Sequence, residues 1–194
     1  LGMAVGHTVE VIEAIETLKG NGPDDLMDLC LVLGSLALVR ARKAKSEREA
    51  RQMLQQSIDT GLALEFFRRL IIAQGGDPNV IENYELMPTA QFKFEFKVPG
   101  TGTKWIEHLD GLKVADACKL MGAGRERKGE PINLAVGVVL HSKVGSQVQG
   151  GDTLATVHAD SEEQFLKASA KLGEAFRFSD TEVSVPAIIK SATV

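Results

Sequence analysis

The sequence has few of the residues that form disulfides or bind metals in small proteins. It contains two cysteines among 194 residues, and Cys30 and Cys118 each lie in an apolar helical pattern. This setting predicts buried thiols in a reducing compartment rather than a disulfide framework. There is no CxxC pair and no HExxH motif, so the sequence gives no ground for a zinc site. We therefore expect a cytoplasmic protein without disulfides.

A basic surplus and a long apolar run are also missing. The formal net charge is −4, which leaves no excess of cations to neutralise phosphates, and we expect no nucleic-acid partner. No apolar run approaches the roughly 18 residues that a membrane-spanning helix requires, so we expect no membrane partner. Hydrophobic residues make up 44% and charged residues 25% of the chain. That balance is typical of a globular protein with a buried core.

Hydrophobic periodicity divides the chain into a helical part and a mixed part. Ser46 and Glu49 form a capping box at the start of one helix, while residues 91–98 alternate apolar and polar side chains as a half-buried strand does. The expected helices cover 9–18, 26–41, 46–60, 62–74, 112–121 and 161–175, and the expected strands cover 91–98, 105–109, 135–140, 147–148 and 153–158. We predict an α+β fold with a helical part at 1–84, a linker at 85–90, a C-terminal domain at 91–181 and a tail at 182–194.

Several short stretches occur in one order along the chain. They are LGMAVGH (1–7), EAI (13–15), GP (22–23), DL (25–26), AQGG (73–76), MGAGR (121–125), AVG (135–137) and VG (144–145). In series they resemble the thymidine/pyrimidine-nucleoside phosphorylases, from the first residue to about Asp180. The resemblance implies an enzyme that splits uridine or thymidine with phosphate, giving the free base and a pentose 1-phosphate. It also implies helices left over from an α/β phosphorylase domain, followed by a hammerhead or barrel-sandwich-like C-terminal domain.

The resemblance implies that the principal catalytic motifs lie upstream of these residues. The family's Lys-His-Ser-Thr-Gly-Gly phosphate loop is absent from the sequence, as are the residues that hold the pyrimidine. Phosphorolysis needs amides that cradle phosphate and donors that stabilise the departing base. We therefore expect a C-terminal portion with no catalytic residue of its own, inactive without the N-terminal portion. Its uncovered apolar faces should associate with that portion or with a second copy.

The resemblance also implies a monovalent-cation site. The family uses two backbone carbonyls and a glutamate, separated by three and then nine residues, and these match Leu1, Ala4 and Glu13. A hard cation such as potassium prefers oxygen ligands, and a turn before a helix leaves carbonyls available. On periodicity alone, Glu13 is simply a charge beside the apolar stripe of a helix.

Gly122, Gly124 and Arg125 resemble the family loop at the mouth of the substrate cleft. Such a loop closes over substrate and excludes water. Taken alone, the two glycines predict only a helix stop followed by a turn. We assign Arg125 no catalytic role, and we expect His7 to cap or pack in the turn before the first helix.

A second hypothesis comes from the glycine-spaced stretch 136–157. It resembles the half-barrel of biotinyl and lipoyl carriers, which suggests a non-catalytic scaffold or a carrier-like binding module. Carriers present a lysine at a tight hairpin tip, usually beside methionine. Lys143 lacks that setting, and Gly145 is better explained as a turn-forming residue.

Overall fold

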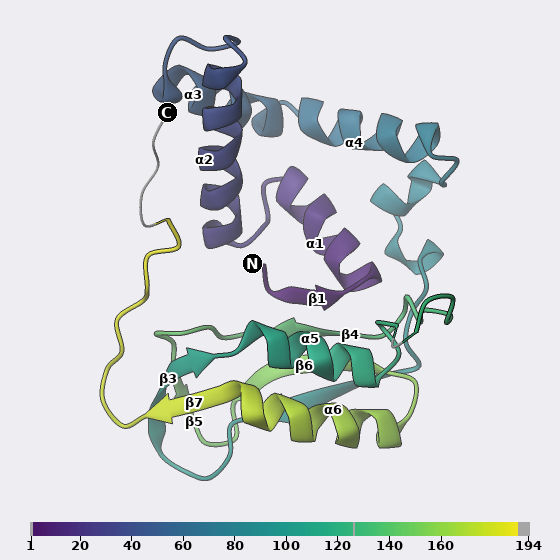
Figure 1. The fold of residues 1–194 in the computed structure, drawn as a ribbon, viewed down its shortest axis with the longest axis vertical. Helices are drawn as coiled ribbons and strands as arrows, with labels where there is room; N and C mark the ends of the chain where they lie inside the picture. The colour runs from purple at the N-terminus through teal and green to yellow at the C-terminus, as the bar shows by residue number, and fades with distance from the viewer. Residues whose placement is uncertain (1, 126, 190–194) are drawn as a thin grey trace. The chain divides into compact units, whose positions relative to one another are not determined.

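The chain forms two compact units, described here for residues 2–125 and 127–189 of a computed structural model (Figure 1). The helical unit comprises Gly2, Ile12–Leu86 and residues 187–189, and the sheet unit comprises Met3–Val11 and Met87–Pro186. Helices and antiparallel sheets are both present, which confirms the predicted α+β class. Met3–Val11, expected from the sequence in the helical part, groups with the sheet unit because its strand pairs there.

Helices make up most of the helical unit, and the third of them begins at a side-chain cap. These are α1 (Thr8–Leu18, which begins in the sheet unit), α2 (Asp24–Arg40), α3 (Glu47–Asp59) and α4 (Leu62–Ala73), followed by the 3-10 turns η1 (Pro78–Ile81) and η2 (Tyr84–Leu86). At the start of α3, Ser46 Oγ accepts the Glu49 N–H at 3.2 Å, as the capping box predicts. The Glu49 carboxylate accepts from the backbone N–H of Lys45 at 2.8 Å, one residue before the expected partner.

A polar cluster ties the last turn of this unit back to α1. Lys19 Nζ donates to the Ile81 carbonyl and to the Tyr84 hydroxyl, each at 3.0 Å. Tyr84 in turn donates to the Glu16 carboxylate. The pKa of Glu16 is lowered, chiefly because this hydroxyl bonds to the charged carboxylate. The cluster therefore fixes where the chain leaves the helical unit.

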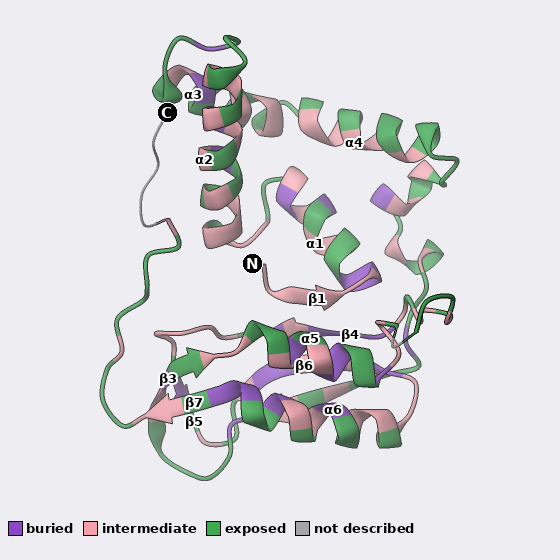
Figure 2. Cartoon of the chain, in the orientation of Figure 1, coloured by how far each residue is buried: buried purple, intermediate pink, exposed green. Residues whose placement is uncertain are grey.

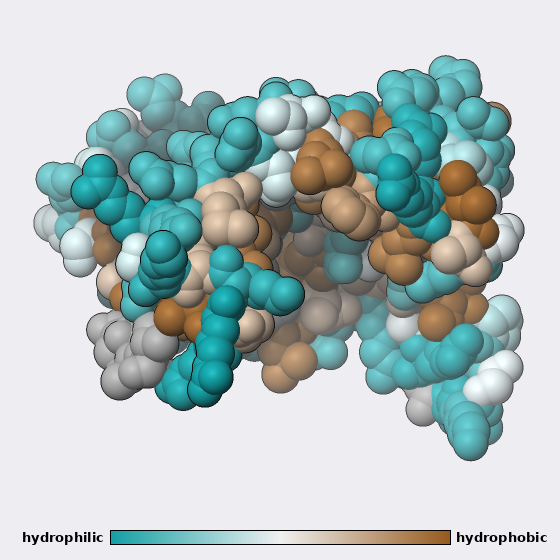
Figure 3. Space-filling model, turned by 90° about the horizontal axis from the view of Figure 1, so that it is seen from above, coloured by the Kyte–Doolittle hydropathy of each residue, from teal (hydrophilic) through white to brown (hydrophobic). Residues whose placement is uncertain are grey.

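Much of the apolar surface of the helical unit is uncovered. No residue of α4 is buried, and Leu62, Phe66 and Leu70 form an exposed stripe at i, i+4 and i+8. In α2 only Leu31 and Ser35 are buried, although the helix is apolar over most of its length. Figure 2 shows this scarcity of buried residues, and Figure 3 shows hydrophobic residues at the surface among hydrophilic ones.

The sheet unit consists of two antiparallel sheets and two helices. The strand orders are β1-β4-β6-β2 and β5-β3-β7. The elements are β1 (Ala4–Gly6), β2 (Phe92–Lys97), β3 (Thr103–Leu109), α5 (Gly111–Leu120), β4 (Gly137–Leu140), β5 (Gln147–Gln149), β6 (Thr153–Ala159), α6 (Glu162–Ala175) and β7 (Phe176–Ser179). Periodicity predicted every element of this list except β1 and β7.

Side chains of α5, α6 and the strands share one core. The largest fully buried members include Ile106, Met121, Leu154, Val157 and Leu172. Phe94 of β2 and Phe165 of α6 stack with ring centroids 4.6 Å apart. Removing each such aliphatic side chain from water contributes about 1.5–3 kcal/mol, so this core supplies the main stabilisation of the unit.

Truncating Leu172 should destabilise the sheet unit. The residue is fully buried (0% exposed) in α6, so we expect Leu172→Ala to lower the free energy of unfolding by about 2–5 kcal/mol. Urea unfolding followed by the fluorescence of Trp105, the single tryptophan, measures this directly. Leu166→Ala is the matched control, because Leu166 lies on the same helix but is 60% exposed. Equal losses in the two variants would contradict the described core.

Candidate active-site segment

The pairing of β1 with β4 brings the N-terminal segment to the sheet unit. Gly6 lies opposite Gly137 in an antiparallel register. A Cβ at Gly137 would lie 2.8 Å from the Val5 carbonyl oxygen, and a Cβ at Gly6, where φ is +152°, would lie 2.9 Å from the Val136 carbonyl oxygen. Both positions therefore require glycine for the two backbones to approach this closely.

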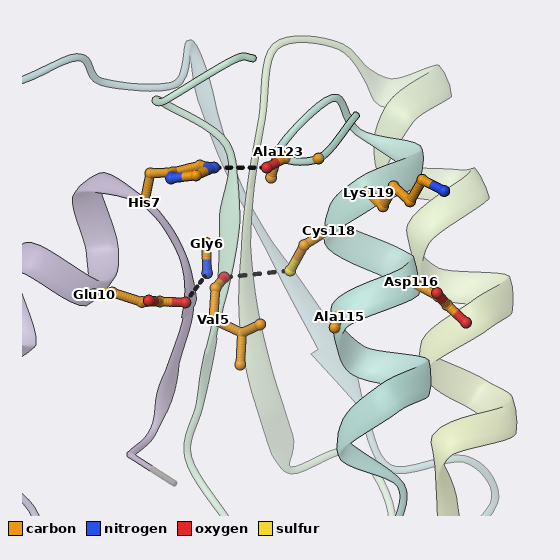
Figure 4. Close-up of a pocket in the computed structure, with 10 residues that line it drawn as sticks. Val5, Gly6, His7, Glu10, Ala115, Asp116, Cys118, Lys119 and Ala123 are labelled. Carbon is orange, nitrogen blue, oxygen red and sulfur yellow. Dashed lines mark hydrogen bonds between the residues drawn. The ribbon is translucent and has the colours of Figure 1, made fainter. Parts of the chain in front are cut away.

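A pocket of about 310 Å³ opens between the β1–α1 turn and α5 (Figure 4). It lies wholly within the sheet unit. One wall is formed by the end of β1 and the start of α1, and the other by α5 and the first residues after it, with the Asp116 and Lys119 side chains directed away from His7 and Glu10. The lining residues are Val5, Gly6, His7, Glu10, Ala115, Asp116, Cys118, Lys119, Ala123 and Gly124.

Two side chains bond to backbone groups here, those of His7 in the β1–α1 turn and of Glu10 in the first turn of α1. His7 Nε2 lies 2.6 Å from the Ala123 carbonyl oxygen. A carbonyl can only accept, so Nε2 carries the proton and donates it. The backbone N–H of Gly6, at the end of β1, donates to the Glu10 carboxylate at 2.8 Å. Both interactions organise the backbone around the pocket.

Cys118 faces the pocket as a protonated thiol. Its Sγ donates to the Val5 carbonyl at 3.2 Å. Burial raises the pKa of the thiol to about 12, and the negative charge of Glu10 adds to the rise. Because the thiolate is the nucleophilic form, Cys118 is unreactive at neutral pH. The predicted burial of Cys118 is confirmed, whereas that of Cys30 is wrong, because Cys30 lies on an uncovered face of α2.

The loop after α5 is closed at its base. Gly122 adopts φ +101° and ends the helix, and its carbonyl accepts the backbone N–H of Asn133 at 2.9 Å. The Asn133 side chain donates to Asp160 at 2.6 Å. Gly124 lines the pocket, whereas Arg125 is exposed and its Nε donates to the Glu130 carbonyl at 2.8 Å. The structure therefore brings Gly124 to the pocket, leaves Gly122 at the end of α5 outside the pocket lining, and turns Arg125 into the loop.

The sheet unit matches a known domain, and the whole chain matches known enzymes. Residues 105–179 match the family model described as pyrimidine nucleoside phosphorylase C-terminal domain. The pyrimidine-nucleoside phosphorylase of Geobacillus stearothermophilus is 41% identical over 189 residues, which are 97% of this chain and 43% of that relative. The enzymes of the same name from Staphylococcus haemolyticus and Staphylococcus aureus are 43% and 44% identical, over 84% and 82% of this chain and 37% and 36% of their own lengths. The chain belongs to the pyrimidine-nucleoside phosphorylase family.

The chain spans less than half of the length of these curated phosphorylases. It corresponds to the part of them that carries the C-terminal domain. Within the described residues, no helix is long and apolar enough to cross a membrane.

The phosphorylase resemblance predicted cation ligands at three positions. Leu1 lies outside the described residues. Ala4 lies in β1, opposite Val139. Glu13 lies in α1, with its carboxylate against Gly2, so that a Cβ at Gly2 would clash with it. No three His, Cys, Asp or Glu side chains gather as a metal-binding group in the part of the chain that the structure describes. Two of the predicted ligands are backbone carbonyls, which such a grouping does not include, so the cation site stays a prediction.

The contacts of His7 and Cys118 with the backbone were missed by sequence reasoning. His7 and Ala123 are 116 positions apart, and Cys118 and Val5 are 113 positions apart. A bond to a backbone carbonyl requires no particular residue type at the accepting position. Only the sheet pairing shows that these segments meet. The turn-forming role expected of Gly145 does appear, since it has φ +87° within a turn in which Ser146 N–H donates to the Lys143 carbonyl.

The two cysteines should differ sharply toward a thiol reagent. At pH 8 we expect one thiol per native chain to react, that of Cys30, and two after unfolding in guanidinium. Even at pH 9, a thiol with a pKa of about 12 is ionised only to roughly 0.1%. The variant Cys30→Ser should show almost no labelling until it unfolds. Rapid native labelling of that variant would show that the Cys118 thiol is accessible and ionised.

Proposed function

We propose that this chain is the C-terminal part of an enzyme that splits uridine or thymidine with phosphate. The observation that carries the proposal is the 41% identity to a pyrimidine-nucleoside phosphorylase over 97% of the chain. Phosphate attacks the glycosidic carbon of the nucleoside while the bond to the base nitrogen breaks. The products are the free pyrimidine and a pentose 1-phosphate.

The reaction requires groups that this sequence does not contain. Negative charge builds up on the departing base, and phosphate must be held for attack by amides or cations. The Lys-His-Ser-Thr-Gly-Gly motif expected for the second task is absent from the 194 residues. We infer that this chain alone is inactive. Its contribution is structural: the loop at Gly122–Arg125 covers the substrate, and a potassium ion held by Leu1, Ala4 and Glu13 stiffens the phosphate site.

The uncovered apolar stripe on α4 supports a partner for the helical unit. Leu62, Phe66 and Leu70 are at least half exposed, which is costly for side chains of this size in water. The relatives are more than twice as long as the matched region. We infer that the stripe, defined by these three residues, packs against the portion of the enzyme that the relatives contain and this chain does not.

Phosphorolysis should depend on adding the N-terminal portion of the enzyme. We expect no release of uracil or thymine from uridine or thymidine by this chain with phosphate, and release after addition of the N-terminal portion of a relative. Ultraviolet absorbance or chromatography of the base measures this. Activity of the chain alone would place catalytic groups within it, and inactivity of both mixtures would favour the scaffold or carrier-like module. Full activity with tetramethylammonium in place of potassium would show that the reaction does not require a potassium ion.

A polar substitution in the α4 stripe should weaken this association. We expect Phe66→Ser to reduce the affinity for the N-terminal portion about tenfold or more, because a Phe side chain no longer becomes buried on binding. Leu166→Ser is the matched control, since both side chains are 60% exposed and Leu166 lies in α6 of the sheet unit. Isothermal titration calorimetry measures both affinities. Equal affinities in the two variants would show that the stripe is not the docking surface, and a dimer of the chain alone by sedimentation would assign the stripe to a second copy.

A further inference from the structure

The contact between His7 and Ala123 joins the β1–α1 turn to the loop that begins at Gly122 (Figure 4). We propose that His7 is a positioning residue. Its Nε2–H holds the first residues of the loop against the turn, so that loop movement begins at Gly124 and not at Gly122. The part that this plays in catalysis rests on the proposed function, whereas the anchoring itself does not.

The His7 side of the contact is carried by a fixed segment. Gly6, directly before His7, is held in the sheet opposite Gly137. Directly after it, the Thr8 backbone N–H donates to the Leu134 carbonyl at 3.2 Å, and Thr8 is buried. The imidazole therefore projects from a backbone that is bonded on both sides of it. Such a donor can hold its acceptor in place, because its own position is fixed by the sheet pairing.

On the other side of the contact, Ala123 lies where α5 has ended and the exposed loop begins. The Ala123 N–H donates to the Cys118 carbonyl at 3.0 Å, and its carbonyl accepts from His7 at 2.6 Å. Ala123 is thus bonded through both of its backbone groups. Beyond Gly124, Arg125, Arg127 and Lys128 are exposed, and Arg125 bonds within the loop to Glu130.

The two glycines of the loop consequently have different roles. Gly122 is fixed by its φ of +101° at the end of α5 and by the bond from Asn133. Gly124 follows the anchored Ala123, and a Cβ there would lie 3.1 Å from Cγ and 3.4 Å from Cβ of Lys119. A hinge requires a residue whose dihedral angles can change without breaking bonds. Gly124 meets this requirement, and it does so because His7 holds the residue before it.

Amide hydrogen exchange of this chain tests the anchor. The reporters are the amides of Gly122, Ala123 and Asn133, whose hydrogen bonds close the base of the loop. We expect His7→Leu to speed their exchange roughly two- to tenfold, the effect of one lost hydrogen bond whose acceptor can turn to water. His7→Gln should restore the rates of the natural protein, because its side-chain amide keeps a donor at a similar reach.

His141→Leu is the matched control. It removes an imidazole that bonds to Thr156 Oγ1 at 2.8 Å elsewhere in the same unit, and it should leave the loop amides unchanged. The proposal is overturned if His7→Leu leaves the loop amides unchanged, if His7→Gln fails to restore them, or if β6 amides accelerate equally.

A kinetic measurement on the reconstituted enzyme extends the test to catalysis. With the N-terminal portion added, we expect kcat/KM for uridine to fall roughly two- to tenfold in His7→Leu and to recover in His7→Gln, because the loop closes from a misplaced hinge. Unchanged kcat/KM together with faster loop exchange would overturn the role in catalysis. If no mixture has activity, the proposed function fails, while the exchange rates still decide the anchor.

Discussion

The antiparallel pairing of β1 with β4 is the constraint on which the candidate site depends. Three residues near the start of the chain lie against a strand that begins at Gly137. The close approach of Gly6 and Gly137 makes this register specific, because a side chain on either residue would collide with the facing backbone. The pairing supplies one wall of the pocket, with His7 and Glu10, while α5 and its following loop supply the other. Without this pairing, the loop after α5 would lack the hydrogen bond between His7 and Ala123.

Much of the fold follows from local signals. Ser161 accepts the Gln164 N–H at 3.2 Å, and Asp110 accepts the N–H groups of Leu112 and Lys113, so the helix starts are determined within a few residues. The alternation through β2 is long enough to identify a half-buried strand. In contrast, β1 has three residues and β7 four, and both arise from pairing with distant strands. Too short to show a period, such strands depend on tertiary contacts that local patterns do not contain.

In the candidate site, too, local patterns predicted some features and missed others. The family resemblance and the predicted helix stop identified Gly122 and Gly124, and Gly122 has a local reason to be glycine in its φ of +101°. Motif spacing did not reveal that His7 bonds to Ala123, because a backbone carbonyl can accept a hydrogen bond whatever the side chain of its residue is. The error over Cys30 has another cause. Periodicity shows that a face of α2 is apolar, but not whether the described chain contains the surface that covers it.

Three polar side chains around the pocket are engaged in hydrogen bonds with the backbone. His7 uses its Nε2 proton on a carbonyl, Glu10 accepts from the Gly6 amide, and the Cys118 thiol is protonated and bonded to Val5. A general base or a nucleophile needs a lone pair directed at substrate, with a pKa near the working pH. Each of these groups instead bonds to the backbone of its own unit. Because those bonds fix where the loop leaves α5, we propose that the segment acts on phosphorolysis through the position of Gly124.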